Sequence, residues 1–541
     1  MPPSSKRPRS SSSIVAAVVV AACAACSGDD AGPIGPPECD ARALQRALDA
    51  AGPGGVVGVG ACRVEGALRV PPGVVLQGAG RDLSSIAAGG ERVIGLEPGD
   101  LAAPTTLRAI TIESTARAGV ASDGTGSVRV EDVTVRSTRG AAMGLLGLTE
   151  ATLSDVELAG PVTAANATND LFLRVAGAEP RGGVLPSDPS ECGSVEPTCA
   201  PGERDDAVPC DGCGTVARLC DGCGRWVTLT ATEGLRVESV ERVALSTVSI
   251  HGFASFGLVA RRAASVHIEN GRIEENLGVG ILAEDASLDL RDVEVRETLQ
   301  GFRAIPSYAA FVSRSDDASA TTVTSQRLRV ESNDAYGLVL LGTLSEHADL
   351  VARDNGDVGV WVGASRGFRA TGADTLLEGN GLAGLLLSES SGIHVEGATV
   401  RGTREKLRNV GAGDVSASVR IGDGIQLAGS FADVTLRDVA LSDNARVGLL
   451  VELPDASGDI TFENVSVARG TGRAGALAGM RTGASQLVPT AALGWDDGIL
   501  RDADTEVVDR TFADVLDIAA VVAPGDAPIP DDVVSIVGPC D

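Results

Sequence analysis

The chain has 541 residues, a formal net charge of −28 at pH 7 and only 3% aromatic residues. A protein this acidic lacks the general basic surface on which proteins hold nucleic acid, so we exclude that class of partner. Size alone would suggest about three or four ordinary domains, unless the chain is a repeat whose core grows along one direction.

The N-terminus has the layout of an export signal. Lys6, Arg7 and Arg9 precede an apolar run over residues 14–22, which is too short to span a bilayer. The run ends in Ala21-Ala22-Cys23, which resembles the bacterial lipobox, so we expect a signal peptide over residues 1–22 and lipidation of Cys23.

Residues 23–38 would then be the lipid anchor and a flexible tether. An outer-membrane lipoprotein of the cell envelope, touching the membrane through its lipid only, is the expected location. A soluble secreted protein cleaved near residue 23 is the alternative.

Residues 40–53 predict a short amphipathic helix. Leu44 and Leu48 fall on one face, Asp40 suits the N-cap, and Gly52-Pro53 would end the helix. Cys39 and Cys62 bracket this segment and are placed to clip it to the strands that follow.

Five asparagines are each followed, four residues later, by a glycine that opens a short apolar run. The pairs are Asn276–Gly280, Asn333–Gly337, Asn355–Gly359, Asn380–Gly384 and Asn444–Gly448. Where nothing intervenes, successive glycines lie 22 to 25 residues apart. A fixed period of this size indicates stacked repeat units, and it specifies an architecture without specifying a reaction.

Within each period, apolar and polar residues alternate over short runs, which is the pattern of β-strands. About three such strands fit in one period, and they cannot enclose a core alone, so neighbouring units must stack and share one. We expect the asparagines to adopt the left-handed conformation at a sharp bend and to form an amide ladder along the stack. We expect each glycine to supply a positive φ. Ordinary turns of a β-sandwich are the alternative reading.

On these motifs the chain resembles the right-handed parallel β-helix proteins of the pectin-lyase-like superfamily. In that family a short amphipathic helix covers the first coil, and a P-x-G-V-x-L-x-G-x-G segment, here residues 71–80, starts the stack. The resemblance covers roughly residues 40–480. It implies enzymes that work in a groove along one sheet, with an Arg or Lys base beside Ca²⁺-binding carboxylates in lyases and paired aspartates in hydrolases.

Signatures of those active sites are missing from this sequence, because N-T-D, G-H-G and D-P-H do not occur. The Asp pair of Trp495-Asp496-Asp497-Gly498 is interpreted as a C-terminal turn beyond the last coil. Three Trp and two Tyr leave few side chains on which sugar rings could stack. The four histidines are expected on the outside of the coils.

Six of the eleven cysteines crowd into residues 192–223, within a Pro-, Gly- and Asp-rich insertion at about 177–226. If Cys23 carries the lipid, ten remain, an even number that suits an oxidising compartment. Two C-x-x-C-G knuckles could hold Zn²⁺ through four thiolates, but only six residues separate them, so disulfides are the preferred interpretation. The four knuckle residues are Cys210, Cys213, Cys220 and Cys223.

The sequence therefore predicts an all-β protein: a single-stranded right-handed parallel β-helix with a short N-terminal capping helix and loop insertions. The predicted segments are the helix stack at 39–485, insertions at about 177–226, 302–326 and 401–422, and a C-terminal segment at 486–541. The basic cluster in 401–422 is a candidate for contact with an acidic glycan.

The function we expect is that of a monomeric, surface-exposed, non-catalytic binding or structural module, with carbohydrate or a cell-surface protein as partner. The alternative is a polysaccharide lyase, hydrolase or epimerase acting on acidic glycans. No cofactor is assigned, and the sequence leaves calcium and zinc open.

Overall fold

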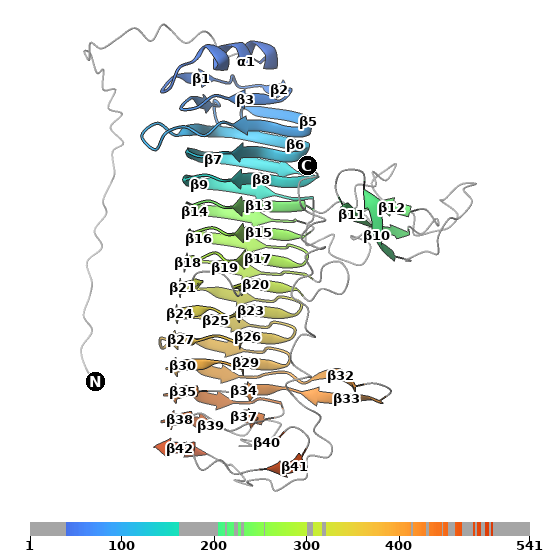
Figure 1. Ribbon diagram of the computed structural model, residues 1–541, viewed down its shortest axis with the longest axis vertical. Helices are drawn as coiled ribbons and strands as arrows, with labels where there is room; N and C mark the ends of the chain where they lie inside the picture. Colours follow the sequence, from blue (N-terminus) through green and yellow to red (C-terminus); the bar gives the residue numbers. More distant parts are fainter. Residues whose placement is uncertain are drawn as a thin grey trace, which may run out of the picture. The chain divides into compact units, whose positions relative to one another are not determined.

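The computed structural model is a stack of parallel β-coils with one helix over its first coil (Figure 1). It describes residues 39–161, 204–210, 214–220, 226–228, 232–253, 255–299, 307–315, 321–412, 415–428, 432–445, 447–452, 460–467, 480–481, 484–487, 493–496 and 499–500. The predicted signal peptide, Cys23 and the tether lie outside these residues.

Each complete coil contributes one strand to each of three parallel sheets, which we call sheets I, II and III in the order in which the chain visits them. Sheet I contains β8 (Gly140–Leu146), β13 (Thr232–Glu238), β15 (Phe256–Arg261), β17 (Val279–Glu284), β20 (Tyr308–Ser313), β23 (Tyr336–Leu341), β26 (Val358–Gly363), β29 (Ala383–Ser388), β34 (Asp423–Ala428) and β37 (Val447–Glu452). Sheet II contains β18 (Leu288–Arg291), β21 (Thr322–Gln326), β24 (Leu344–Ala348), β27 (Gly367–Thr371), β30 (Ser391–Glu396), β35 (Ala432–Arg437), β38 (Ile460–Glu463) and β42 (Leu493–Asp496).

Sheet III contains β19 (Glu294–Arg296), β22 (Arg329–Glu331), β25 (Val351–Arg353), β28 (Leu376–Glu378), β31 (Thr399–Arg401), β36 (Ala440–Ser442), β39 (Ser466–Val467) and β43 (Ile499–Leu500). In the earlier coils a single long strand bends through more than one sheet. These strands are β5 (Ser85–Leu96), β6 (Thr105–Asp123), β7 (Ser127–Ser137), β9 (Glu150–Ala159), β14 (Arg242–His251) and β16 (Ser265–Glu274). The first coils contain β1 (Val56–Gly58), β2 (Arg63–Glu65), β3 (Leu68–Val70) and β4 (Val75–Gln77).

The core is the continuous interior of this stack. Alternate residues of every sheet point inward, and the side chains of one column, such as Leu338, Val360 and Leu385, are fully buried against those of the coils before and after. Each added coil extends the interior columns of Val, Ile and Leu. The apolar surface that it buries stabilises the fold by about 25 cal/mol per Å². The predicted parallel β-helix is therefore confirmed.

Asparagines occupy the corner between sheets III and I and are hydrogen bonded along the stack. Asn333 Nδ2 donates to Asn355 Oδ1 at 2.7 Å, and Asn355 Nδ2 donates to Asn380 Oδ1 at 2.9 Å. Thr298 and Thr403 occupy the same corner in the coils that lack an asparagine, and their backbone N–H groups donate to Asn333 and Asn444.

The left-handed residue at this corner differs from the one that we expected. It is the residue before each asparagine, for example Ser332 with φ 57°, Asp354 with φ 55° and Gly379 with φ 64°. This bend turns the following asparagine side chain inward, where its amide reaches the next coil.

The repeating glycines also serve a different purpose from the expected one, because none of the five has a positive φ. A Cβ atom on Gly359 would lie 2.5 Å from Nδ2 of Asn380 and 2.7 Å from the carbonyl oxygen of Gly384. These glycines are therefore required by the close approach of the next coil and of its asparagine.

Helix α1 (Ala41–Ala50) covers the first coil, as the sequence predicts. Asp40 accepts from the backbone N–H groups of Arg42 and Ala43, and Leu44 and Leu48 are buried. The side-chain amide of Gln45 pairs with both backbone groups of Arg69, at 2.9 and 2.8 Å, and so satisfies part of the open edge of β3.

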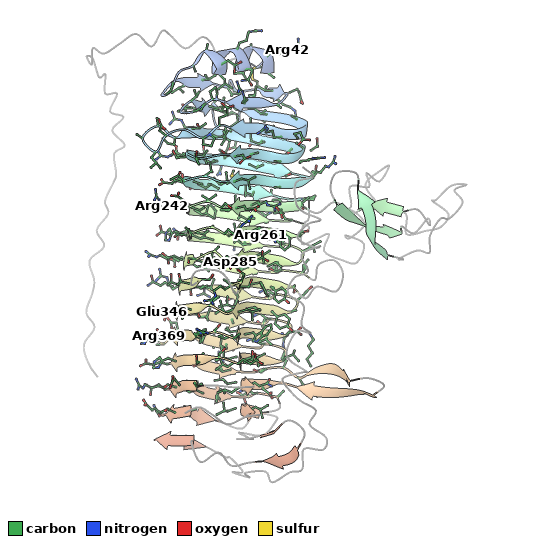
Figure 2. The ribbon with its side chains drawn as sticks, viewed as in Figure 1. Arg42, Arg242, Arg261, Asp285, Glu346 and Arg369 are labelled. Atoms are coloured by element: carbon green, nitrogen blue, oxygen red, sulfur yellow. A yellow bond between two sulfur atoms is a disulfide. The ribbon has the colours of Figure 1, made fainter. Side chains whose placement is uncertain are left out.

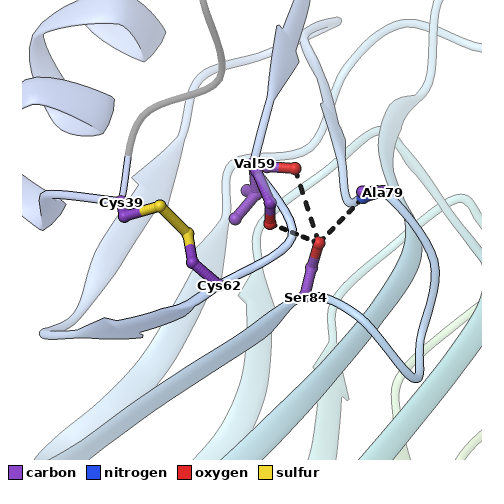
Figure 3. Close-up of a disulfide and its surroundings, with 6 residues drawn as sticks. Cys39, Val59, Cys62, Ala79 and Ser84 are labelled. Atoms are coloured by element: carbon purple, nitrogen blue, oxygen red, sulfur yellow. Dashed lines mark hydrogen bonds between the residues drawn. A yellow bond between two sulfur atoms is a disulfide. The ribbon is translucent and has the colours of Figure 1, made fainter.

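A disulfide between Cys39 and Cys62 joins the start of this helix to the first coil (Figure 3). Beside it, the hydroxyl of Ser84 accepts from the backbone N–H of Ala79 and donates to the carbonyl of Gly60. The disulfide and this hydroxyl hold the first turns of the stack together.

Among the connections from sheet III to sheet I, those after β9, β19 and β31 are longer than the usual turn, and we call these three connections excursions. In the first excursion β10 (Arg204–Cys210), β11 (Gly214–Cys220) and β12 (Trp226–Thr228) form a small antiparallel sheet, and in the third β32 (Lys406–Ala412) and β33 (Val415–Ile421) form a hairpin. A further antiparallel pair joins β40 (Met480–Arg481) and β41 (Ala484–Leu487).

Two predicted boundaries differ from the structure. The insertion expected at 302–326 contains β20 and β21, which are regular coil strands, so the second excursion is shorter than expected. The β-helix expected to end at 485 continues, because β42 pairs with β38 and β43 with β39, so Trp495 and Asp496 lie on a coil strand and not beyond the last coil. In the described part of the chain, no helix is long and apolar enough to cross a membrane.

Candidate functional site

The outward surfaces of the three sheets differ in chemistry. On sheet III one outward column alternates in sign from coil to coil: Glu274, Arg296, Glu331, Arg353, Glu378 and Arg401. Nη2 of Arg353 lies 2.9 Å from Oε2 of Glu331, and Nε of Arg401 lies 2.8 Å from Oε1 of Glu378. The charges of this sheet are largely neutralised by their own neighbours.

Sheet I presents an apolar outward surface with an aromatic cluster. The rings of Tyr308 and Tyr336 stack at 5.2 Å, Phe311 meets Tyr308 edge-on at 5.1 Å, and Trp361 lies 6.2 Å from Tyr336. Both tyrosines of the chain are in this cluster, which sequence reasoning missed. All four rings are buried, so they are not available as an open sugar-stacking surface.

Sheet II carries an accessible polar column. Successive coils place His267, Asp289, Thr324, Glu346, Arg369, His394 and Thr435 in register on its outward surface. In parallel coils neighbouring members of such a column lie about 4.8 Å apart. This spacing allows several of them to contact one extended ligand.

The centre of this column is the candidate site. Figure 2 shows Glu346 on β24 and Arg369 on β27 on the same side of the stack. Both side chains are exposed, and within the described residues neither forms an ion pair or side-chain hydrogen bond. His394 follows on β30, where its Nε2 lies 2.9 Å from Oε2 of Glu396.

Beside these groups runs a column that begins with Leu344 and continues with glycines. Leu344 precedes Glu346 by two residues, and its neighbours in the next coils are Gly367 and Gly392. Leu344 is 42% exposed, one of few large apolar residues that the described surface leaves open. Glu346, Arg369 and His394 therefore lie beside a column in which the exposed Leu344 is followed by two glycines.

A second cluster lies earlier in the same column. Asp289 is held by Arg291 at 3.0 Å and by Nδ1 of His267 at 2.9 Å, and Thr324 Oγ1 lies 3.2 Å from its other oxygen. Partial burial would raise the pKa of Asp289, but the hydrogen bonds from Arg291 and His267 outweigh it and hold this pKa below its usual value. His267 is thereby fixed in orientation with one nitrogen engaged.

Comparison with solved structures finds similar chains at low identity. The chain is similar to the A-module of the mannuronan C-5 epimerase AlgE4 of Azotobacter vinelandii, with 13% identity, a TM-score of 0.35 and coverage of 82% of this chain and 95% of that one. The periplasmic alginate epimerase AlgG matches with 10% identity, a TM-score of 0.33 and coverage of 85% and 83%. A GH87 α-1,3-glucanase catalytic domain matches with 8% identity, a TM-score of 0.29 and coverage of 87% and 70%.

The strand pairing of the chain itself makes it a parallel β-helix, as the sequence predicts. No protein-family model and no curated protein sequence matches the chain.

The asparagines singled out from the sequence lie away from sheet II. The five asparagines are buried at the corner between sheets III and I. Cys210 and Cys220 end strands β10 and β11, but the side chains of all four knuckle cysteines lie outside the described residues, so neither disulfides nor zinc is tested there. No group of three or more His, Cys, Asp or Glu side chains suited to a metal ion occurs in the described residues.

Three of the four histidines of this β-helix, His251, His267 and His394, are partly exposed as expected. His347 is different, because it points into the interior and is buried beside Phe368. The sheet II column was missed because its members follow no local motif. Only the coil register brings Glu346, Arg369 and His394 together, although they are 23 to 25 residues apart.

Proposed function

We propose that this β-helix binds a polysaccharide that carries carboxylate groups, and that the ligand lies along the outward surface of sheet II. One observation carries the proposal: Arg369 is an exposed guanidinium without a partner among the described residues, between Glu346 and His394 in a continuous polar column. Guanidinium groups bind carboxylates through two parallel hydrogen bonds.

The neighbouring groups complete the chemistry that a glycan needs. Glu346, His394 and Thr435 can hydrogen bond to hydroxyls, and the exposed side chain of Leu344 can contact the carbon face of a sugar ring. Successive coils place one of these polar groups about every 4.8 Å along the column, so an extended ligand can contact several of them. On sheet III the corresponding arginines are already paired with glutamates and offer no free guanidinium to a carboxylate. This difference favours sheet II as the binding surface.

The binding experiment uses the tether-free protein and a panel of acidic and neutral polysaccharides, including alginate, pectin and chondroitin. Arg369→Ala should weaken binding to the acidic ligand at least tenfold, because a charge-assisted hydrogen bond contributes about 1.5–3 kcal/mol. Arg353→Ala on sheet III is the matched control and should bind as the parent does. Equal affinity of Arg369→Ala and the parent would refute the proposed site.

Catalysis on a uronate is the second candidate, and the adjacency of Arg369 and His394 favours it. Removal of a proton next to a carboxylate requires a cation to neutralise the anion and a base to take the proton. The arginine could supply the first requirement and the imidazole, held by Glu396, the second. Formation of unsaturated ends, or deuterium uptake from solvent into the polymer, would show the reaction, and binding without either would leave a binding module.

We also propose that the protein is exported and anchored by a lipid on Cys23. Support comes from the leader, whose basic residues and apolar run end at Ala21-Ala22-Cys23. Metabolic labelling with a fatty acid should mark the protein, and Cys23→Ala should abolish the label and release the protein into the soluble envelope fraction. A labelled Cys23→Ala variant would contradict this assignment.

A further inference from the structure

The inner surface of sheet II carries a group of polar side chains in two consecutive coils, those of β21 and β24. Ser325 on β21 and Ser345 and His347 on β24 point inward and are buried. Thr321 and Thr343 immediately precede these two strands and are buried at the turns between sheets I and II. We call these five residues the interior polar cluster, and none of them is more than 7% exposed.

Four buried atoms of this cluster have no hydrogen-bond partner among the described residues. They are Oγ1 of Thr321, Oγ1 of Thr343, Oγ of Ser345 and Nε2 of His347. Ser325 Oγ lies 2.7 Å from Nδ1 of His347, so one nitrogen of the imidazole is engaged and the other is not. Burial of a polar atom without a hydrogen bond is unfavourable, so the cluster requires a partner.

The same turns in the next two coils satisfy their hydroxyls with the backbone. Ser365 Oγ donates to the carbonyl of Gly363 at 3.1 Å, and Ser390 Oγ donates to the carbonyl of Ser388 at 2.7 Å. Thr321 and Thr343 form no such bond. The missing partners are therefore a property of the coils of β21 and β24 and not of the turn in general.

The spacing of these groups suits a bridging molecule. Thr321 and Thr343 lie in successive coils, which are about 4.8 Å apart. Thr343, Ser345 and His347 alternate along one chain segment in steps of about 6.6 Å. A water molecule with two hydrogen bonds of about 2.8 Å joins groups that are about 5 Å apart.

The surroundings select a neutral ligand. The inward residues of the other two sheets in these coils, such as Val312, Val330 and Leu340, are apolar. The cluster contains hydroxyls and one imidazole and no carboxylate, so it lacks the charge that a buried cation needs. Ser345 and Ala370, which flank His347 on its own strand and on the next, are small. Water is the ligand that matches hydroxyl and imidazole groups enclosed in an apolar core.

We infer that the interior polar cluster is a binding site for ordered water, which bridges Thr321 to Thr343 and Ser345 to Nε2 of His347. A buried water makes about three hydrogen bonds, so about two molecules satisfy the four atoms. Leu344 and Glu346 occupy the outer surface of the same strand, so this water lies directly behind the candidate site. The inference is independent of the polysaccharide proposal, which concerns the outer surface.

A high-resolution crystal structure of the protein tests the site directly. It should show ordered water within hydrogen-bonding distance of at least two of the four atoms. If all four atoms were bonded directly to protein groups, or if no density lay beside them, the inference would be overturned.

Magnetic relaxation dispersion of oxygen-17 in water gives an independent readout in solution, because it detects water that stays inside a protein longer than the protein takes to rotate. Thr343→Val/Ser345→Val/His347→Leu replaces three of the four partners with side chains like those of the neighbouring interior positions and should reduce the dispersion amplitude. Val434→Ala, in the same inner surface five coils along from Leu288, is the control and should not reduce it, since an apolar cavity stays dry. Equal amplitudes in the triple variant and the parent would contradict the inference. If the triple variant does not fold, the crystal structure of the parent decides.

Discussion

Glu346 and Arg369 are direct neighbours on β24 and β27 and carry opposite charges, yet they form no ion pair. Glu331 and Arg353 stand in the same relation on sheet III, and there Nη2 of Arg353 lies 2.9 Å from Oε2 of Glu331. One geometry thus gives an ion pair on sheet III, whereas on sheet II the same geometry leaves two groups without a partner among the described residues. The free groups mark the surface that is chemically ready for a ligand.

Glu346→Gln should strengthen binding of an acidic polysaccharide several-fold. The substitution keeps the hydrogen-bonding shape of the side chain and removes one negative charge beside Arg369. Titration calorimetry at neutral pH, compared between low and physiological salt, measures the gain and its screening. Glu331→Gln on sheet III should leave affinity unchanged, and weaker binding by Glu346→Gln would instead indicate that its carboxylate accepts hydroxyls of the ligand.

Asn355→Ala should lower the free energy of unfolding by about 3 kcal/mol, because each lost hydrogen bond contributes about 1 kcal/mol and its buried partners stay unsatisfied. Asn355 donates to Asn380 and to the carbonyl of Val330, and it accepts from Asn333. Thr403→Asn is the opposite test, because Thr403 lies between Asn380 and Asn444 with its hydroxyl unpaired among the described residues. Thr403→Asn should raise the denaturation midpoint. If Thr403→Asn lowered the midpoint as much as Asn355→Ala does, the asparagine ladder would not stabilise the stack additively.

The sequence revealed the coil because the asparagine–glycine spacing recurs in five of the repeats. It did not reveal the aromatic cluster, because Ala309 replaces the glycine in that coil and a short excursion precedes it, so the period was lost between Gly280 and Gly337. The same gap explains why 302–326 was assigned to an insertion. The left-handed residue at the corner was missed because Glu275, Ser332 and Asp354 share no residue type.

His347 should make the stack less stable as the pH falls below neutral. Its Nδ1 lies 2.7 Å from Ser325 Oγ, its Nε2 has no partner among the described residues, and burial lowers its pKa to about 4 from 6.5. Between these values the unfolded chain takes up a proton that the folded chain does not, so stability falls as the pH drops from 6.5 to 4, by about 3 kcal/mol in total.

His347→Met should remove the pH dependence that His347 contributes, because methionine fills the buried site with an apolar side chain of similar length that does not titrate. Denaturation midpoints between pH 7 and pH 4 measure the slope. His394→Gln, at the surface of sheet II, is the control and should keep the slope of the parent. Glu233 also titrates near this range, so the comparison is made in a Glu233→Gln background. If the stability of that background protein did not change between pH 7 and pH 4, the prediction would be contradicted.

Glu233 should make the protein less stable as the pH rises, the opposite of the effect of His347. It is 1% exposed, Oε2 has no hydrogen-bond partner among the described residues, and Nη1 of Arg236 lies 3.8 Å away. Burial raises its pKa to about 7 from 4.5, against the attraction of Arg236 and Arg261. Between these two values the folded chain retains a proton that the unfolded chain has lost. The protonated carboxyl therefore contributes stability that is fully present below pH 4.5. This contribution, about 3 kcal/mol, is lost as the pH rises to about 7.

Glu233→Gln imitates the protonated side chain at every pH. Relative to the parent it should be stabilised at pH 8 and nearly unchanged at pH 4, as measured by denaturation midpoints. Glu241→Gln, on the turn before β14, serves as the control and should shift neither. A variant that is less stable than the parent at pH 8 would show that the charged carboxylate is compensated by its arginines.

Gln426→Leu should stabilise the protein by about 1–2 kcal/mol, because a buried amide without hydrogen bonds costs about that much and leucine has a similar volume. Gln426 is 0% exposed, lies between Leu386 and Leu450 on sheet I, and neither Oε1 nor Nε2 has a partner among the described residues. Denaturant unfolding should show a higher midpoint with an unchanged slope. The matched control is Gln77→Leu, whose amide oxygen accepts from Arg108 at 2.6 Å, and this variant should not be stabilised. Destabilisation by Gln426→Leu would mean that the amide is hydrogen bonded in solution.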